Sequence, residues 1–411
     1  MVSAASRAGQ VATRNGHVSL EDWDRHSEFP GLAGLAYLNT AAEGPAGMRL
    51  GHALARYAAD RAQGTVGRDA LLATETACRA SVARLLACAS DEVALLSSTT
   101  DALNAVLHSL PWSPGDNLVV TDLEFPTALI ACLHLGRRLG VEVRVVRHRG
   151  GRIDPEILAE RIDTRTRLVV VSHVSYRSGY RCDVAALARL AHERGALIFV
   201  DAAQSLGAVQ VHVGDVDFLA SCTFKWLLGS HGLAVLYCRR ALVRELTPTH
   251  VGWRSVSDHF SVARTLRYEL LDDARRFEAG MPNFEAVYAL HDALVLLLDE
   301  VGMDWVEERV LDLSGRAVAG LGAIGVPLLT PDMAADRAGI VTFEAVDSLA
   351  IGAALEARGI VTWCRDGRVR VSPHFYNTAG EVDAFCGAVG EVWCGTRAKR
   401  DDLRTVGVSD G

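Results

Sequence analysis

Residues 217–230 read DFLASCTFKWLLGS, an apolar run followed by a lysine and a glycine-containing turn. Of the 42 basic residues in the chain, only Lys225 and Lys399 are lysines. Lys399 stands in the charged stretch TRAKRDDLR, which is typical of a solvated tail. A desolvated lysine can lose its proton and attack a carbonyl carbon, whereas arginine stays protonated. Lys225 is therefore a candidate Schiff-base lysine, and the alternative is a lysine left at a strand end by chance.

A second segment, FVDAAQ at 199–204, places Asp201 at the end of an apolar strand. Ligands collect at the carboxyl ends of parallel strands, and a buried aspartate needs a partner to stay ionised. A protonated pyridine nitrogen would be such a partner. Asp201 and Lys225 both follow strands, so a ring between them would place its nitrogen at Asp201 and its aldehyde at Lys225. This arrangement predicts pyridoxal 5'-phosphate as the cofactor.

Two further features would complete such a site. Ser98–Thr100 follows a predicted strand and opens a predicted helix over 101–110. The free N–H groups at a helix N-terminus favour a phosphate, although plain N-capping would give the same sequence. Phe125 follows the predicted strand 117–121 and could stack on the ring, the alternative being a core phenylalanine.

The chain from about 70 to 240 alternates short apolar runs with helical patterns. This alternation predicts an α/β fold with a mostly parallel sheet and helices on both faces. The expected strands are 92–97, 117–121, 142–146, 168–173, 197–200, 218–222 and 233–238. The expected helices are 70–88, 101–110, 127–139, 155–162 and 184–194.

The rest of the chain predicts a smaller α+β domain at the C-terminus. Long helices are expected over 284–300 and 303–321, then strands 340–343 and 369–372 around a helix at 348–358. The predicted boundaries are an N-terminal arm over 1–35, a large cofactor-binding domain over 36–285 and a small domain over 286–411. The sequence GLGAIG at 320–325 formally fits a dinucleotide fingerprint, but it ends a helical stretch, so a turn is expected.

Composition excludes several classes of function. The net charge of −8 argues against a nucleic-acid-binding surface. Nine cysteines, odd in number and without a CxxC pair, predict free thiols in a reducing compartment, hence the cytoplasm. The apolar runs are too short for a signal peptide or a membrane span, and no metal site is indicated.

Seven segments in order resemble the class V aminotransferase family of fold-type I pyridoxal phosphate enzymes. That family includes cysteine desulfurases, kynureninases, isopenicillin-N-epimerase-like proteins and cysteine-conjugate lyases. The segments are YLNTAAEGP at 37–45, SSTTDALN at 97–104, SHVSYRSGYRCDV at 172–184, VDAAQSLGAVQV at 200–211, SCTFKWLLGSHGLAVLY at 221–237, RRFEAGMPNF at 275–284 and RVRVSPHFYNT at 368–378. The resemblance implies the fold-type I transferase fold and a homodimer with its active site near the subunit interface.

The resemblance also implies roles for individual residues. Lys225 matches the Schiff-base lysine, Asp201 the partner of the pyridine nitrogen, and Gln204 the residue that hydrogen-bonds the ring hydroxyl. Arg370 matches the arginine that clamps the substrate carboxylate, a task suited to the guanidinium fork. The remaining expected contacts are Thr99 and Thr100 for the phosphate, Phe125 and Cys222 beside the cofactor, and Asn39 and Tyr176 on the substrate side.

Departures from the desulfurase pattern bear on the reaction. Desulfurases carry a nucleophilic cysteine on a mobile loop before the substrate arginine. Here only WCRDG at 363–367 connects the helix to the arginine strand, so Cys364 has little reach and is expected to be a packed thiol. Phe224 precedes the lysine where desulfurases have histidine, and Met281 replaces a threonine that reaches the partner subunit.

These features predict a pyridoxal phosphate enzyme acting at Cα or Cβ of a small-molecule amino acid. The favoured reaction is C–S β-elimination from a cysteine S-conjugate in secondary metabolism, as in antibiotic biosynthesis. The alternatives are aldehyde formation by decarboxylation with oxidative deamination, and amino transfer or epimerisation. An alternative of another class is a non-catalytic protein of the same fold that binds a partner.

Overall fold

A seven-stranded sheet forms the centre of the large domain in the computed structural model, which describes residues 25–260 and 266–406, with side chains to 393. The strand order is β2-β8-β7-β6-β5-β3-β4, and only β8 runs antiparallel to its neighbours. The prediction of a mostly parallel sheet is therefore confirmed. The strands are β2 (Val93–Leu96), β3 (Asn117–Thr121), β4 (Glu142–Val146), β5 (Thr166–Ser172), β6 (Leu197–Asp201), β7 (Phe218–Cys222) and β8 (Ala234–Cys238).

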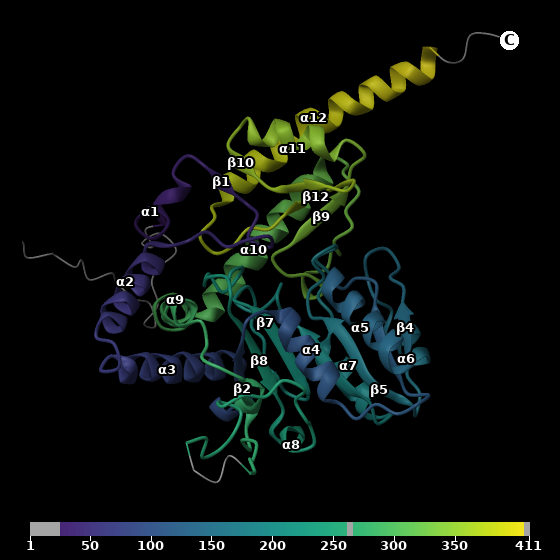
Figure 1. Ribbon diagram of the computed structural model, residues 1–411. Coiled ribbons are helices and arrows are strands. Elements are labelled where there is room, and N and C mark those ends of the chain that lie inside the picture. The colour runs from purple at the N-terminus through teal and green to yellow at the C-terminus, as the bar shows by residue number, and fades with distance from the viewer. Residues whose placement is uncertain (1–24, 261–265, 407–411) are drawn as a thin grey trace, which may run out of the picture.

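Helices cover both faces of this sheet, as predicted (Figure 1). One face contacts α4 (Thr99–Ser109) and α5 (Pro126–Leu139). The other face contacts α3 (Arg68–Leu86), α6 (Pro155–Arg161), α7 (Val184–His192) and α9 (Phe284–Val295). The remaining helices of this part are α1 (Arg25–Glu28), α2 (Met48–Ala62) and α8 (Arg240–Val243), with short turns η1 (Pro30–Leu32), η2 (Ser90–Glu92) and η4 (Ala274–Phe277).

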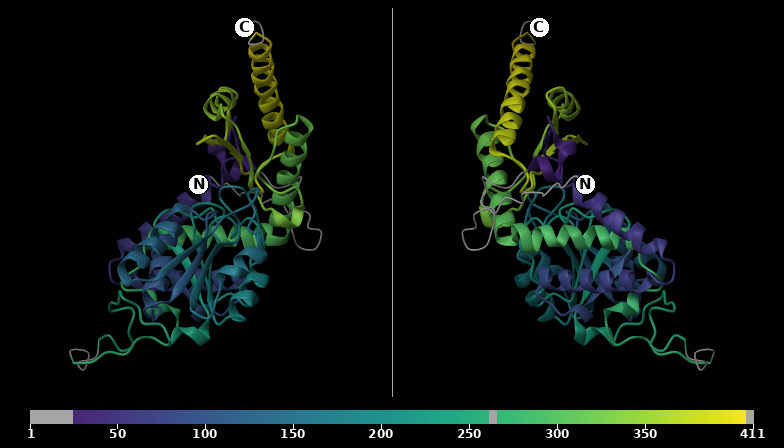
Figure 2. Two further views of the ribbon diagram at one scale, coloured as in Figure 1. Left: turned by 90° about the vertical axis from the view of Figure 1, so that its right-hand side faces the viewer. Right: turned by 90° about the vertical axis from the view of Figure 1, so that its left-hand side faces the viewer.

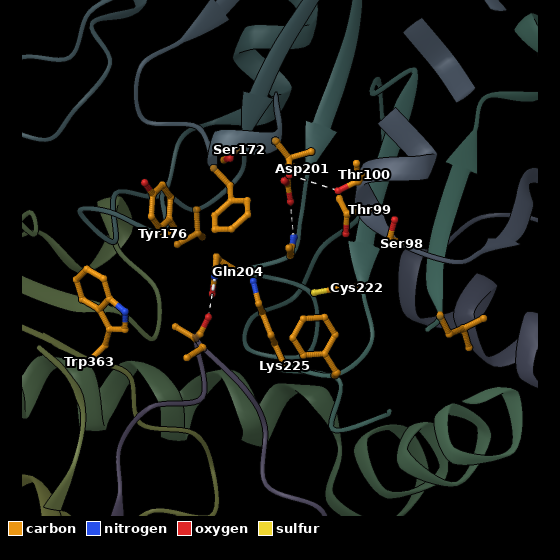
Figure 3. Close-up of a pocket in the computed structure, with 18 of the residues that line it drawn as sticks. Ser98, Thr99, Thr100, Ser172, Tyr176, Asp201, Gln204, Cys222, Lys225 and Trp363 are labelled. Carbon is orange, nitrogen blue, oxygen red and sulfur yellow. Dashed lines mark hydrogen bonds between the residues drawn. The ribbon is translucent and has the colours of Figure 1, made fainter. Parts of the chain in front are cut away.

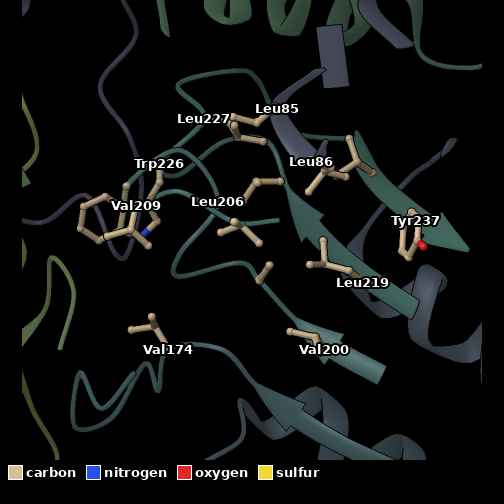
Figure 4. Packing of buried hydrophobic residues seen from close by; sticks show 14 of the residues in the cluster. Leu85, Leu86, Val174, Val200, Leu206, Val209, Leu219, Trp226, Leu227 and Tyr237 are labelled. Carbon is tan, nitrogen blue, oxygen red and sulfur yellow. The ribbon is translucent and has the colours of Figure 1, made fainter. Parts of the chain in front are cut away.

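The main core lies between the sheet and the second helical layer. Figure 4 shows Val200 and Leu219 of adjacent strands beside Leu206, Trp226 and Leu227 from the loops that follow β6 and β7. These side chains are buried, because strands covered on both faces need apolar residues at every position. The core therefore reaches up to the loops at the carboxyl edge of the sheet and fixes their backbone.

The small domain is built on the three-stranded antiparallel sheet β11-β12-β9. Its strands are β9 (Val341–Glu344), β11 (Trp363–Arg365) and β12 (Arg368–Val371). A separate parallel pair joins β1 (Ala36–Tyr37) to β10 (Ile360–Val361). The helices are α10 (Met303–Ala323), α11 (Ser348–Glu356) and α12 (Ala379–Val406), with a turn η6 (Ala334–Asp336) and a π-helical segment η5 (Leu296–Val301) between α9 and α10.

Several boundaries and elements differ from the sequence predictions. The segment WCRDG is not a bare link, because its first three residues form the edge strand β11 and Asp366 and Gly367 make the turn into β12 with positive φ. Helix α4 begins at Thr99, two residues before the predicted start. The helix predicted over 284–300 changes to η5 from Leu296. The sequence prediction omitted α2 and α12.

The small domain sits over the carboxyl edge of the large sheet, and α12 projects away from it (Figure 2). Helix α10 links the two parts and contributes Leu313 and Ala317 to the small-domain core. No helix in the described ranges is long and apolar enough to cross a membrane. Residues 1–24 of the predicted arm lie outside the described residues, and the domain boundaries stay a prediction.

Candidate active site

One cavity of about 450 Å³ opens at the carboxyl ends of β5, β6 and β7, beneath the small domain. The N-terminus of α4 and residues of β11 and β12 complete its wall (Figure 3). Nine of the ten predicted site residues line it: Thr99, Thr100, Phe125, Tyr176, Asp201, Gln204, Cys222, Lys225 and Arg370. Asn39 does not line the cavity; it forms a backbone bridge with Ser372, and its buried Oδ1 has no partner.

Asp201 and Lys225 lie on neighbouring strand ends. Asp201 is the last residue of β6, and its Oδ1 accepts a 2.8 Å hydrogen bond from the Ala203 N–H. Its carboxylate borders the cavity but lies far from bulk solvent, so burial raises its pKa, opposed by the Ala203 N–H and by Lys225. The Lys225 Nζ lies 5.5 Å from the ring centroid of Phe125 and 5.7 Å from that of Phe224. A cationic ligand atom at Asp201 would satisfy this carboxylate.

Contacts from distant segments hold the loop that carries Lys225. The Gly44 N–H donates to the Phe224 carbonyl at 2.8 Å, and a methyl group at Gly44 would overlap the Lys225 carbonyl oxygen. The buried indole of Trp226 donates to Gln204 Oε1 at 2.8 Å. The Trp226 carbonyl lies 2.9 Å from Nε2 of His374, whose pKa burial lowers to about 4. The histidine is therefore neutral at pH 7 and donates to this carbonyl.

Gln204 is fixed at both ends of its amide. Its Nε2 donates to the Ala41 carbonyl at 3.0 Å, while its Oε1 accepts the Trp226 indole N–H. An amide nitrogen has two N–H groups, so one remains for a ligand in the cavity. The residue can thus serve both as a loop brace and as a donor to a bound ring.

The first turn of α4 faces the cavity. Ser98 is the N-cap and accepts from the Asp101 N–H at 3.0 Å, so the capping interpretation holds for this residue. The Thr99 hydroxyl is buried near the Cys222 thiol and has no hydrogen-bond partner among the described residues. Thr100 shares a 3.3 Å hydroxyl contact with Thr127. Free N–H groups, hydroxyls and the helix dipole together suit an anion such as a phosphate.

Aromatic side chains form much of the wall. The rings of Phe125 and Tyr176 meet edge to face, with centroids 5.2 Å apart and planes at 79°. Phe224 is stacked on His231 with centroids 4.2 Å apart. Phe125 is the residue before α5 and is 45% exposed, so it is not a core phenylalanine. Its ring lies beside the cavity and can cover a planar ligand.

Arg370 extends from β12 into the cavity. Its Nη1 donates to the Tyr176 carbonyl at 3.1 Å, but its buried Nε has no partner. The side chain is 6% exposed, and burial first, then the charge of Arg368, lowers its pKa to about 10. Its guanidinium also lies 5.3 Å from the ring centroid of Trp363. The site therefore presents a buried cation with unused donors.

Sequence reasoning missed a carboxyl group behind the cavity. Glu124 accepts hydrogen bonds from Ser172 at 2.5 Å and from Thr121 at 2.7 Å. Burial, only partly opposed by these donors, raises its pKa to about 7. Ser172 closes β5 beside Asp201 and lines the cavity. The position of Ser172 at the end of an apolar strand could have indicated that it lies at the cavity. The contact with Glu124 depends on tertiary packing, which the sequence does not show.

The two cysteines discussed for catalysis have different surroundings. Cys364 follows Trp363 on β11, and because strand neighbours point to opposite faces, it points away from the cavity. Its thiol packs against the small-domain core and lies 3.2 Å from the Thr362 hydroxyl. Cys222 lines the cavity floor, and burial raises its pKa. All eight cysteines with described side chains are unpaired.

No group of three or more metal-ligating side chains occurs in the part of the chain that the structure describes. A parallel sheet with a lysine, an aspartate and a helix N-terminus at its carboxyl edge defines a fold-type I pyridoxal phosphate enzyme. Residues 49–385 match the family model "Aminotransferase class-V". The chain therefore belongs to the class V aminotransferase family, whose members are pyridoxal phosphate enzymes, and the predicted fold class, enzyme class and cofactor are confirmed.

The names of similar proteins describe aminotransferases and cysteine desulfurases. The chain is 33% identical over 323 residues to the "Uncharacterized aminotransferase YcbU" of Bacillus subtilis, covering 78% of this chain and 84% of the relative. It is 30% identical over 402 residues to a "Probable cysteine desulfurase" of Methanothermobacter thermautotrophicus, covering 90% and 97%.

Solved structures show the same fold over nearly the whole chain. The apo cysteine desulfurase of Thermococcus onnurineus superposes with a TM-score of 0.83 at 27% identity, covering 90% of this chain and 98% of that chain. A cystine C–S lyase, solved with its product cysteine persulfide, gives a TM-score of 0.81 at 22% identity, covering 88% and 99%.

Proposed function

We propose that this protein is a C–S β-lyase that cleaves a cysteine S-conjugate. The overall reaction consumes the conjugate and one water and releases a thiol, pyruvate and ammonium. When bound, pyridoxal phosphate supplies an electron sink for the pair left at Cα. The protein must remove the Cα proton, let the thiol leave from Cβ and keep the substrate oriented.

Residues of the large domain are proposed to hold the cofactor. Lys225 would hold its aldehyde carbon, Asp201 its ring nitrogen and Gln204 its ring hydroxyl. Thr99 and Thr100 would bind the phosphate at the start of α4, and Phe125 would cover one face of the ring. Cys222 would contact the cofactor from the cavity floor. The unsatisfied Thr99 hydroxyl and the deeply placed Asp201 carboxylate support this arrangement.

The substrate is proposed to bind between the ring and the small domain. Arg370 would take its α-carboxylate, because the guanidinium faces the cavity and keeps a buried N–H without a partner. Tyr176 would contact the substrate beside Phe125. Asn39, which was expected on the substrate side from the sequence, lies outside the cavity wall, so no direct contact with the substrate is proposed for it. Lys225 would carry the Cα proton.

The observation that carries the proposal is the orientation of β11. A desulfurase must present a thiolate to the substrate sulfur, and the thiolate is the reactive form. Trp363 of β11 lines the cavity, so Cys364 faces the core of the small domain, and burial raises its pKa. The sulfur atom of the substrate therefore has no acceptor thiolate on β11. It would leave as part of the thiol that is released from the conjugate.

Product analysis tests the reaction type. Purified holoenzyme is incubated with S-alkyl cysteines, and thiol, pyruvate and ammonium are quantified, with Lys225→Ala as the inactive control. The proposal expects all three products in equal amounts. Amino transfer to an added 2-oxo acid, carbon dioxide with an aldehyde, or inversion of Cα would each overturn it in favour of another reaction. A protein that takes up no cofactor would be a non-catalytic binding protein.

The proposal also covers the oligomeric state, the cellular location and the metabolic role of the protein. We propose a homodimer with its active sites near the interface, supported by the exposed apolar side chains of residues 251–281. These are Val251, Trp253, Phe260, Leu266, Tyr268 and Met281.

A cytoplasmic location is supported by the unpaired cysteines. A role in secondary metabolism, including antibiotic biosynthesis, is proposed because the substrate pocket departs from that expected of desulfurases.

A further inference from the structure

A second arginine stands beside Arg370 on the small-domain sheet. Arg368 and Arg370 are two positions apart on β12, so both point to the same face. Trp363 lies directly opposite Arg370 on the neighbouring strand and shares this face. The guanidinium carbons of Arg368 and Arg370 lie 5.5 and 5.3 Å from the centroid of the Trp363 ring. Two cations thus flank one aromatic ring that lines the cavity.

Neither arginine is neutralised by a carboxylate in the described ranges. Among the residues that the structure describes, no ion pair within 4.0 Å involves Arg368 or Arg370. Glu344 lies opposite Arg368 on β9, but it is exposed and does not reach the guanidinium. The Arg368 guanidinium contacts the ring of Trp363 instead. The charge of Arg368 lowers the pKa of Arg370, so a bound anion on this face would relieve the repulsion between the two guanidinium groups.

Other polar groups on this face also lack partners. The Nε of Arg370 and the Thr342 hydroxyl are both buried and make no hydrogen bond. Thr342 lies opposite Arg370 on β9, so the two unsatisfied groups are neighbours. The α-carboxylate of the proposed substrate would account for Arg370. It would leave Arg368, one step nearer the surface, for a second acidic group.

We propose that the site selects amino acids that carry a second acidic group at the end of the side chain, bound by Arg368 across the face of Trp363. This inference rests on the proposed function and specifies its substrate class as the cysteine thioether of an acidic thiol. Residues two apart on a strand are separated by about 6.6 Å. A chain of a few methylene groups or a thioether spans such a distance, and the Trp363 indole would contact this apolar spacer.

Non-reactive probes test the second anion site directly. Isothermal titration calorimetry of the holoenzyme at low ionic strength would compare glutarate and adipate with butyrate and pentanoate. The dicarboxylates are expected to bind about tenfold more tightly, since one charge-assisted hydrogen-bonded contact is worth about 1.4 kcal/mol or more. Equal affinities for the dicarboxylates and monocarboxylates would overturn the proposal, and this comparison needs no variant.

Variants test whether Arg368 is the residue that causes the dicarboxylate preference. Arg368→Gln is expected to reduce the dicarboxylate preference to below about twofold while butyrate binding is unchanged. Arg358→Gln is the matched control, because Arg358 is an exposed arginine of the small domain that lies outside β9, β11 and β12 and pairs with Glu391. An unchanged preference in Arg368→Gln, or an equal loss in Arg358→Gln, would overturn the proposal.

Turnover separates this inference from the proposed reaction. The comparison is between S-(2-carboxyethyl)cysteine and S-propylcysteine. A lower KM for the acidic conjugate that rises about tenfold in Arg368→Gln, with kcat unchanged, is the expected result. Cleavage of both conjugates with equal KM overturns the second anion site and leaves the lyase proposal standing. Arg368-dependent binding of glutarate without cleavage of either conjugate supports the anion site and overturns the lyase proposal.

Discussion

The surroundings of Lys225 in the cavity are aromatic. Lys225 is enclosed by Phe125 and Phe224 and makes no ion pair in the described parts of the chain. Arginine carries the same charge on a bulkier group that cannot form a Schiff base at neutral pH. The lysine is therefore the residue whose chemical identity matters most.

Lys225→Arg should keep cofactor affinity within tenfold, because the residues at the start of α4 and Asp201 are untouched. Turnover should fall by about 10²–10⁴-fold or more, the range for loss of an acid–base group. Absorbance spectra measure whether the cofactor is bound through a lysine or only non-covalently. A spectrum identical to that of the wild type would show that another group holds the aldehyde.

Cys364→Ala should leave kcat/KM within several-fold of wild type, since the thiol faces the small-domain core. The variant should lose about 1 kcal/mol of stability or less, because the removed sulfur is only partly buried. Steady-state kinetics and mass spectrometry of the intact protein provide the measurements. Loss of activity, together with a protein-bound persulfide in the wild type, would restore the desulfurase interpretation.

The connection between β3 and α5 brings a buried carboxyl group to the cavity edge. Glu124 belongs to this connection and binds Ser172, the last residue of β5. Asp201 closes the adjacent strand β6, and its negative charge adds to the rise in the pKa of Glu124. Strand ends and one loop thus concentrate acidic groups in a small volume, and their protonation affects folding.

Stability should fall as pH rises through this carboxyl group's titration. The pKa of Glu124 rises from 4.5 to about 7 on folding, so between these values the folded chain holds a proton that the unfolded chain has lost. The free energy of unfolding then falls across this window by about 3 kcal/mol. Glu124→Gln should be more stable than wild type at pH 8 and nearly equal at pH 4.5.

Urea unfolding at both pH values checks this, with the exposed Glu356→Gln as control. Other groups also titrate between these pH values, so the quantity to follow is the difference in unfolding free energy between wild type and variant. A difference that does not change with pH would mean that folding leaves the pKa of Glu124 unchanged.

Elements differed in how well the sequence predicted them. The strands of the large sheet were predictable, because strands covered by helices on both sides need long apolar runs. Their ends then indicated Asp201 and, through the loop that follows β7, Lys225. The edge strand β11 was not predictable, since three residues of mixed polarity carry no periodic signal. The placement of Asn39 and Glu124 depended on tertiary contacts that no local pattern records.

The molecule as a whole exposes apolar side chains on one projecting segment. The described residues between α8 and α9, on both sides of 261–265, extend from the large domain, on the side away from α12 (Figure 2). Phe260 is 79% exposed and Tyr268 65% exposed. Exposed apolar groups that cluster in this way mark interaction surfaces. The proposed homodimer would cover them.

Sedimentation analysis should give twice the 44.1 kDa chain mass. Replacing both Phe260 and Tyr268 with serine should weaken association at least tenfold, because burial of an aromatic side chain contributes 1.4 kcal/mol or more. Leu349→Ser is the control, since Leu349 is 72% exposed on α11 of the small domain. A wild-type monomer at micromolar concentration would contradict the proposal.

Because the chain has only two lysines, reagents and proteases that act on lysine have very few sites of attack. A lysine-specific protease can cut the denatured protein only after Lys225 and Lys399, giving fragments 1–225, 226–399 and 400–411. If borohydride first fixes the cofactor on Lys225, the first cut is blocked and a single fragment, 1–399, should persist. A simple gel would then show what fraction of the protein carries its cofactor at the proposed position, with no substrate needed.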